Sequence, residues 1–468
     1  MDKTSENVPK RSEFWFGAGL KSVTLRGRLF DKTTLLTAFL LGLTTFVIFW
    51  PVVLAIEFEE AFFTPLVPLL LSIFDALGID ANLALKILFM SSLVFSTVGI
   101  YFLVRDLTKR QVTAIFAAAL FLVPPVPIFV LSFIRNSILA PELISAKSFF
   151  TVIYGDGAHF LALAIVPYAL LFYLRFLKSG GKRDFLLSVL ALVVILLANR
   201  SQSFYVLLIL AVATLCDMFL GLAREKLKKF ILVLIFCAGL VSFWYTPYFW
   251  LQSVNVIFEY LVNNIRLLFP LPFIIAVLSL LFSFVFFGRR EDRQGIFISI
   301  LSLFIFLAIS IDWILNGRSF LPHPQRLLPD LFMFLAISAA LTFASIFDKT
   351  KLEVRLKFVY WPVWVRTIST LLFAVFSFVI FGLTAYLISP FLISVVSGPG
   401  GIWTKLREGV IADREKTLEI AGGSFQLISG SSDNLQELLS AAVSFVFVLI
   451  LVFLLFNKWK SDETNTVK

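Results

Sequence analysis

The sequence predicts an all-α fold, a polytopic transmembrane helical bundle of about twelve spans. Of the 468 residues, 59% are hydrophobic and only 15% are charged. Apolar runs of about 20 residues, the length that crosses a bilayer, recur from Leu35 to Phe456. These runs lack the short polar and apolar alternation of a lipid-facing barrel, so each segment must satisfy its backbone hydrogen bonds as a helix.

The expected spans follow the apolar runs in chain order. They cover about 35–56, 82–104, 111–134, 158–177, 184–198, 203–222, 230–251, 269–287, 295–315, 330–347, 367–391 and 438–457.

The charges between the spans predict which side of the membrane each loop faces. In a soluble protein the net charge of +10 would suggest a nucleic-acid partner. Here every second loop is basic, which is a topology signal instead. We therefore expect a multi-pass cell-membrane protein with both termini in the cytoplasm and no nucleic-acid partner. The basic loops lie around Lys109, Lys182, Lys228, Arg290 and Lys351.

Three further apolar stretches do not add spans. Residues 61–77 contain Pro65 and Pro68 near their start, and a crossing there would invert every later basic loop. Residues 137–153 and 253–268 mix apolar residues with charges. We expect all three to be interfacial helices in the outer loops.

The first candidate site is an acidic cluster directly after the first span, with Glu57, Glu59 and Glu60. A helical or an extended backbone brings two of these carboxylates onto one face. One of them would then serve as a catalytic base, or two would hold a divalent cation such as Mg or Mn. The alternative is a solvated acidic loop end.

The second candidate site lies at the mouth of the fourth span. Glycines on both sides of Asp156 permit a tight turn that presents its carboxylate, and His159 follows one helical turn later. Asp156 joins the carboxylates that would act in catalysis or hold a metal. A helix N-cap is the alternative role for Asp156.

The third candidate site is a proline-stiffened turn between the ninth and tenth spans. Arg318, His323 and Arg326 present hydrogen-bond donors with little freedom, which suits a phosphate or pyrophosphate. Lipid headgroup binding, or a buried pair with Asp312 or Asp330, is the alternative.

Two further outer cations, Arg135 and Arg200, would join the same phosphate pocket. Carboxylates and phosphate-binding cations thus gather on one membrane face, and no GxxxxGK[ST] nucleotide loop accompanies them. This combination points to an energy source that comes with the substrate, as in a lipid-phosphate-linked sugar.

These features resemble the GT-C superfamily of integral-membrane glycosyltransferases. The nearest resemblance is to the prokaryotic membrane proteins labelled with a 6-pyruvoyl-tetrahydropterin-synthase-related domain. It is carried by the acidic first outer loop with its interfacial helix, by the segment 157–170, and by the segment 325–329. The resemblance implies a carboxylate of the first outer loop as base or metal ligand, and arginines of later loops that neutralise a donor phosphate.

The resemblance also divides the chain. We expect a cytoplasmic tail at 1–34, a GT-C-like core with outer interfacial helices at 35–391, an extracytoplasmic loop at 392–437, and a last span with a cytoplasmic tail at 438–468.

The expected function is that of a membrane glycosyltransferase. Its substrates would be a polyprenyl-phosphate-linked sugar donor and a lipid, glycan or protein acceptor, met at the extracytoplasmic face among membrane lipid. Glu57, Glu59 or Glu60 takes the acceptor proton, and Arg326, with Arg318 or His323, holds the leaving phosphate. The alternatives are a transporter or lipid flippase, and a non-catalytic GT-C-like partner in envelope glycan assembly.

Overall fold

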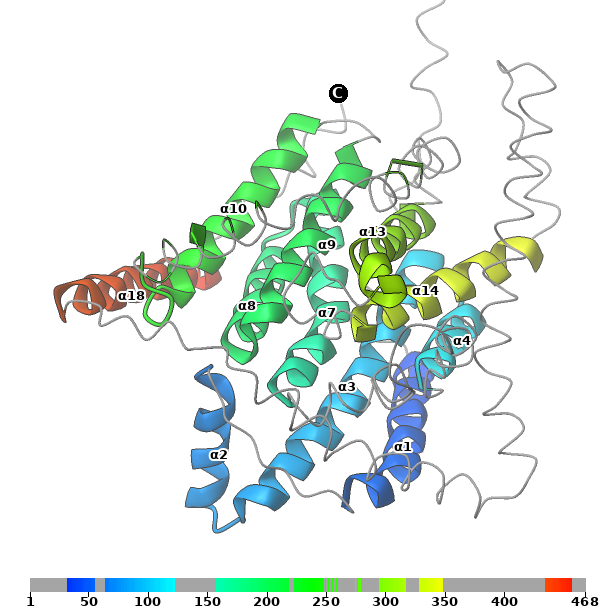
Figure 1. Cartoon of the computed structure of the whole chain (residues 1–468), viewed down its shortest axis with the longest axis horizontal. Helices are drawn as coiled ribbons and strands as arrows, with labels where there is room; N and C mark the ends of the chain where they lie inside the picture. Colours follow the sequence, from blue (N-terminus) through cyan, green and yellow to red (C-terminus); the bar gives the residue numbers. More distant parts are fainter. Residues whose placement is uncertain are drawn as a thin grey trace, which may run out of the picture.

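The computed structural model describes residues 32–54, 64–122, 157–218, 223–247, 294–316, 328–347 and 434–456, with isolated positions between 249 and 278. Every regular element in these residues is an α-helix, which confirms the predicted all-α class (Figure 1). The helices are α1 (Lys32–Leu54), α2 (Leu66–Ala76), α3 (Ala81–Thr108), α4 (Gln111–Leu122), α7 (Gly157–Ser179), α8 (Lys182–Ala198), α9 (Arg200–Met218), α10 (Ala223–Val241), α13 (Gln294–Asn316), α14 (Leu328–Phe347) and α18 (Asn434–Phe456).

Three described helices are long and apolar enough to cross a membrane. They are Ala81–Thr108 of α3, His159–Ser179 of α7 and Leu438–Phe456 of α18. Other apolar helices, such as Gln202–Met218 of α9, are shorter within the part that the structure describes. The described residues therefore do not support the expected twelve spans.

The helix boundaries agree closely with some of the expected runs, whereas α10 begins seven residues before the predicted span 230–251 and ends ten residues before its predicted end. α13 and α14 begin and end within two residues of the predicted spans 295–315 and 330–347. The expected spans 269–287 and 367–391 lie outside the continuously described residues. The same holds for the predicted tail up to residue 31 and for the predicted loop from 392 to 433.

Of the three expected interfacial helices, only the first lies in the described part of the chain. α2 forms there as an 11-residue helix that begins directly after Pro65. Proline fits the start of a helix because its missing N–H would have no intrahelical partner. Residues 137–153 lie outside the described residues, and 253–268 are described only at isolated positions.

The connection between α8 and α9 corrects one boundary. The sequence predicts an outer loop at 199–202, but only Asn199 separates the two helices. Its side-chain Oδ1 accepts a hydrogen bond from the backbone N–H of Gln202 at 3.0 Å, which caps α9. Arg200 and Gln202 therefore belong to the first turn of α9.

Helix α7 lies at the centre of the described bundle. It packs between α3 and α8, while α1 covers the other side of α3 (Figure 1). The aromatic side chains of Phe160, Tyr173 and Phe176 are fully buried in this core. Cys216 and Cys237 are both buried, and neither is in a disulfide.

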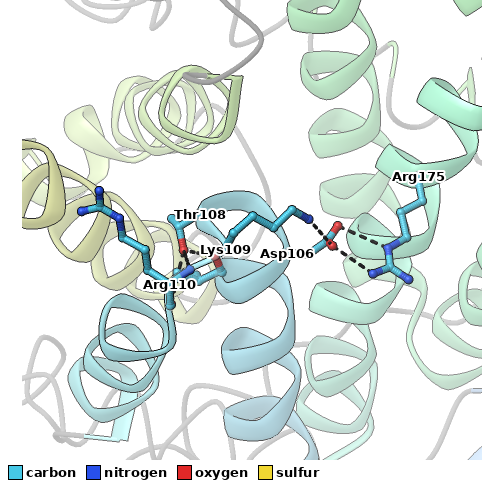
Figure 2. Close-up of polar contacts among 6 residues, drawn as sticks. Asp106, Thr108, Lys109, Arg110 and Arg175 are labelled. Carbon is cyan, nitrogen blue, oxygen red and sulfur yellow. Dashed lines mark hydrogen bonds and ion pairs between the residues drawn. The ribbon is translucent and has the colours of Figure 1, made fainter. Parts of the chain in front are cut away.

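One end of the bundle, which we call the basic end, carries the ends of α3 and α7 together. Asp106 of α3 accepts hydrogen bonds from Arg175 of α7, at 2.9 Å from Nη2 and 3.2 Å from Nε. Lys109 forms an ion pair with the same carboxylate at 2.8 Å. Figure 2 shows Asp106 between these two cations, with Arg110 directed away from it. The bidentate pair fixes α3 against α7.

At the same basic end, α9 and α10 are joined by a buried ion pair. Lys226 Nζ lies 2.6 Å from Asp217 Oδ2, and the two side chains are 14% and 3% exposed. Lys226 and Lys229 also donate to the backbone oxygen of Leu177, at 2.7 and 3.2 Å. These cations neutralise the carbonyl end of α7. Asp217, which the sequence places well inside a span, thus lies at the end of α9.

The C-terminal helix α18 packs on α10 through small residues. Gly239 of α10 faces the ring of Phe447, and a Cβ at this position would lie too close to that ring. Just beyond, the hydroxyls of Ser242 and Ser444 lie 2.9 Å apart, and Ser242 donates to the backbone oxygen of Ser440. Hydrogen bonds between small polar residues are a common means of holding helices together in a membrane.

Candidate functional site

Most of the predicted site residues lie outside the residues that the structure describes. Arg200 begins α9, but its side chain is not among those described, and His159 is the one predicted residue whose side chain is. Those outside are Glu57, Glu59, Glu60, Arg135, Asp156, Arg318, His323 and Arg326. Their convergence on one outer site therefore stays a prediction.

His159 lies in the first turn of α7, at the end of the bundle opposite the basic end. Its side chain is fully buried, and Nε2 lies 3.9 Å from Oδ2 of Asp330, which is also fully buried. The imidazole meets the ring of Tyr205 edge-on, with 6.3 Å between ring centroids. His159, which the sequence singles out, thus faces a buried carboxylate, and its role in the site stays a prediction.

Gln202 brings a third helix to the same carboxylate. Its Nε2 donates to Asp330 Oδ1 at 2.7 Å, between residues that are 128 positions apart in sequence and both fully buried. Asp330 lies in the first turn of α14 and Gln202 in the first turn of α9. We call His159, Gln202 and Asp330 the outer polar cluster, after the side of the membrane that the basic loops predict for this end. The first turns of α7, α9 and α14 thus meet at the carboxylate of Asp330.

The chain after the first candidate site also reaches this end. Thr64, just before α2, donates from its hydroxyl to the backbone oxygen of Ala198 at 2.5 Å. Ala198 is the last residue of α8 and directly precedes Asn199, which caps α9. Thr64 therefore lies against the turn that leads into Gln202.

Polar atoms of the cluster retain hydrogen-bonding capacity. Among the described residues, Gln202 Oε1 and Asp330 Oδ2 have no hydrogen-bond partner, although both atoms are buried. Buried polar groups normally find partners, so an additional donor at this position would be favourable. No group of three His, Cys, Asp or Glu side chains in the described residues has the arrangement of a metal site. The metal ligands predicted from the sequence lie outside those residues.

Sequence reasoning missed Gln202 and named Asp330 only as an alternative partner of the third site. Both residues do carry a signal, since each is a polar side chain in the first turn of an apolar helix. Burying a polar side chain within a membrane costs free energy, so such residues usually face the interior of the protein and commonly mark functional positions.

An isosteric change tests the pairing inside the cluster. Gln202→Glu should lower the melting temperature of the purified protein at pH 8, because it sets one buried carboxylate against another, a like-charge contact that costs several kcal/mol. Part of the loss should return at pH 5, where a shared proton restores the hydrogen bond. Gln111→Glu, at the start of α4, is the matched control. It should melt close to wild type, because the hydroxyl of Thr37, which accepts from Gln111, can donate to the new carboxylate instead. Equal melting of both variants would mean that Gln202 does not face Asp330.

Comparison with known families gives one match. A model of the 6-pyruvoyl-tetrahydropterin synthase related domain, described as a membrane protein, matches residues 61–388. The match includes the whole outer polar cluster and begins one residue after Glu60. Neither the curated proteins nor the solved structures give a match.

Proposed function

Because this chain belongs to the 6-pyruvoyl-tetrahydropterin-synthase-related family of membrane proteins, we propose that it works in a membrane as a multi-pass glycosyltransferase of the GT-C type. The sugar comes from a polyprenyl-phosphate donor and goes to a lipid, glycan or protein acceptor. Transfer takes place at the extracytoplasmic face of the cell membrane, and both termini lie in the cytoplasm.

The outer polar cluster is the observation that carries this proposal. The cluster, together with Thr64 against the turn that leads into Gln202, lies at the end opposite the basic end and stands next to each predicted site in sequence. Thr64 follows Glu60 by four positions, His159 follows Asp156 by three, and Asp330 follows Arg326 by four. Since a chain spans at most about 3.5 Å per residue, four positions reach no farther than about 14 Å. The contacts among these neighbours therefore support one shared site.

In the proposed reaction, the acceptor hydroxyl oxygen attacks the anomeric carbon of the donor sugar. The bond from that carbon to the phosphate oxygen breaks, and polyprenyl phosphate leaves with the electron pair. A carboxylate among Glu57, Glu59, Glu60 and Asp156 receives the hydroxyl proton. Attack opposite the leaving group inverts the anomeric centre.

The leaving phosphate gains negative charge as the bond breaks. Arg326, with Arg318 or His323, stabilises it, and Arg135 and Arg200 add positive charge to the same pocket. Carboxylate oxygens are the ligands that Mg²⁺ and Mn²⁺ prefer, so Glu57, Glu59, Glu60 and Asp156 would hold such a cation if one is required.

A transfer assay tests the function. Full-length protein in lipid nanodiscs receives a radiolabelled sugar on polyprenyl phosphate, together with a panel of lipid and glycan acceptors. We expect labelled product, and Arg326→Ala should reduce its rate by about 10²–10³-fold, as for loss of one charge-stabilising donor. Arg110→Ala, at the basic end, should leave the rate unchanged.

Two outcomes would contradict the proposal. Donor flux across proteoliposomes without any transfer would identify a transporter or flippase. A stably co-purified enzyme, with no activity of this chain alone, would identify a non-catalytic partner.

A further inference from the structure

The exposed face of α10 carries two cations that form no ion pair with the described residues. Lys226 and Lys229 of this helix are engaged with Asp217 and with the end of α7. Arg224 and Lys228 instead are exposed, and neither forms an ion pair with any described residue. They stand four positions apart, so they lie on one face of the helix, one turn above the other.

The same face continues as an apolar ridge. Leu227, Ile231 and Ile235 are 44%, 46% and 51% exposed, and their spacing of four places them in a line that begins beside Lys228 and continues along the helix away from the two cations. Ala238, one turn further, is exposed as well. We call Arg224, Lys228 and this ridge the α10 stripe. Two cations followed by apolar side chains match the order of a charged headgroup and an acyl chain in a phospholipid.

The length of the stripe matches one leaflet of a bilayer. Lys228 to Ala238 spans about 15 Å at 1.5 Å per residue, which is half of the roughly 30 Å hydrocarbon core. At its lower end, Phe447 of α18 lies against Gly239 and closes the face. The stripe thus begins at the basic end of the bundle and stops where α18 crosses α10 (Figure 1).

The charge of the stripe determines which lipid it fits. Arg224 and Lys228 together supply two positive charges. The nearest acid in sequence, Glu225, is also exposed and projects about 100° around the helix from Arg224 and about 60° from Lys228, so the three side chains together keep a net positive charge. Arg guanidinium groups bind phosphate oxygens in a bidentate manner, whereas a zwitterionic headgroup would bring its own cation to the site. A lipid whose headgroup is net negative is therefore favoured.

We propose that the α10 stripe binds an anionic phospholipid, with the phosphate between Arg224 and Lys228 and an acyl chain along Leu227, Ile231 and Ile235. This site is at the opposite end from the proposed transfer site and does not depend on it. Basic clusters at the ends of membrane helices commonly bind anionic headgroups. One face of α10 provides both the two cations that would bind the headgroup and the apolar side chains that would contact the acyl chain.

Native mass spectrometry of the delipidated full-length protein tests the site. Phosphatidylglycerol is titrated against phosphatidylcholine of the same acyl chains, and the bound lipid is counted. Wild type should retain phosphatidylglycerol preferentially, and Arg224→Gln with Lys228→Gln should weaken its binding by about 30-fold, from the effect of two cations near an anionic lipid. Phosphatidylcholine binding should not change.

Two control proteins separate this site from general attraction to the basic end. Lys32→Gln with Arg110→Gln removes the same charge from α1 and the start of α4, and should keep the preference. Arg224→Lys with Lys228→Arg keeps both charges and should also keep the preference. Unchanged phosphatidylcholine binding by the Gln variant shows that this variant has not failed through misfolding.

Three results would overturn the site. The first is equal retention of the two lipids by wild type. The second is an equal loss in the Lys32 and Arg110 control. The third is complete competition by soluble glycerol phosphate at the lipid's concentration, since this would show that the apolar ridge takes no part.

Discussion

Replacing Glu57, Glu59 and Glu60 together by glutamine should reduce sugar transfer by about 10²–10⁴-fold, the usual contribution of a positioned general base. Glutamine keeps the size and hydrogen-bonding capacity of glutamate but cannot take the acceptor proton. The decrease should therefore appear in the turnover number of the nanodisc assay, with donor binding largely retained. The proposed roles of Arg326 and its neighbours in holding phosphate do not require these carboxylates.

Single changes then identify the base among the three. Only one of Glu57→Gln, Glu59→Gln and Glu60→Gln should approach the effect of the triple variant. Asp75→Asn is the matched control, because it neutralises an exposed carboxylate on the neighbouring helix α2. Full activity in the triple variant would remove the first outer loop from the mechanism and leave Asp156 as the candidate base.

Asp217→Ala should destabilise the protein by about 3–5 kcal/mol, the cost of leaving a buried charge without its partner. Asp217 lies 2.6 Å from the ammonium of Lys226, and both side chains are largely shielded from solvent. Lys226 would keep its hydrogen bond to Leu177 but lose the charge that balances it. Thermal melting, read as loss of the monodisperse peak in size-exclusion chromatography, measures the effect.

A double variant distinguishes the charge interaction between Asp217 and Lys226 from the packing of their side chains. Asp217→Leu with Lys226→Met removes both charges and retains much of the volume, so its melting temperature should lie well above that of Asp217→Ala. If the double variant is as unstable as the single one, the charge interaction is not what Asp217 contributes.

The sequence located some of the helices closely because a membrane span needs an unbroken apolar run. The run at 295–315 therefore located α13 within a residue at each end. Local hydrogen bonds were harder to foresee. Asn199 was expected to begin a loop of several residues, yet its side chain caps α9 and reduces the loop to one residue.

The candidate site, like the helices, could be predicted from the sequence only in part. His159 stood out in the sequence because the chain has only two histidines and because this one follows Asp156 by three residues. Its partners did not, since the contact of Gln202 with Asp330 joins positions 128 apart and depends on how α9 and α14 pack. The ion pair of Asp217 with Lys226 was not foreseen for a related reason: it belongs to the helix ends, which hydropathy alone does not locate.

The contact between α10 and α18 has a consequence for how the protein is made. Ser242 and Ser444 meet across 202 positions of the chain, so α10 leaves the ribosome long before its partner exists. During that interval the surface around Gly239 is available to other helices in the membrane. Correct biogenesis therefore includes a late docking step, in which α18 takes a position on α10 that segments made earlier must leave open.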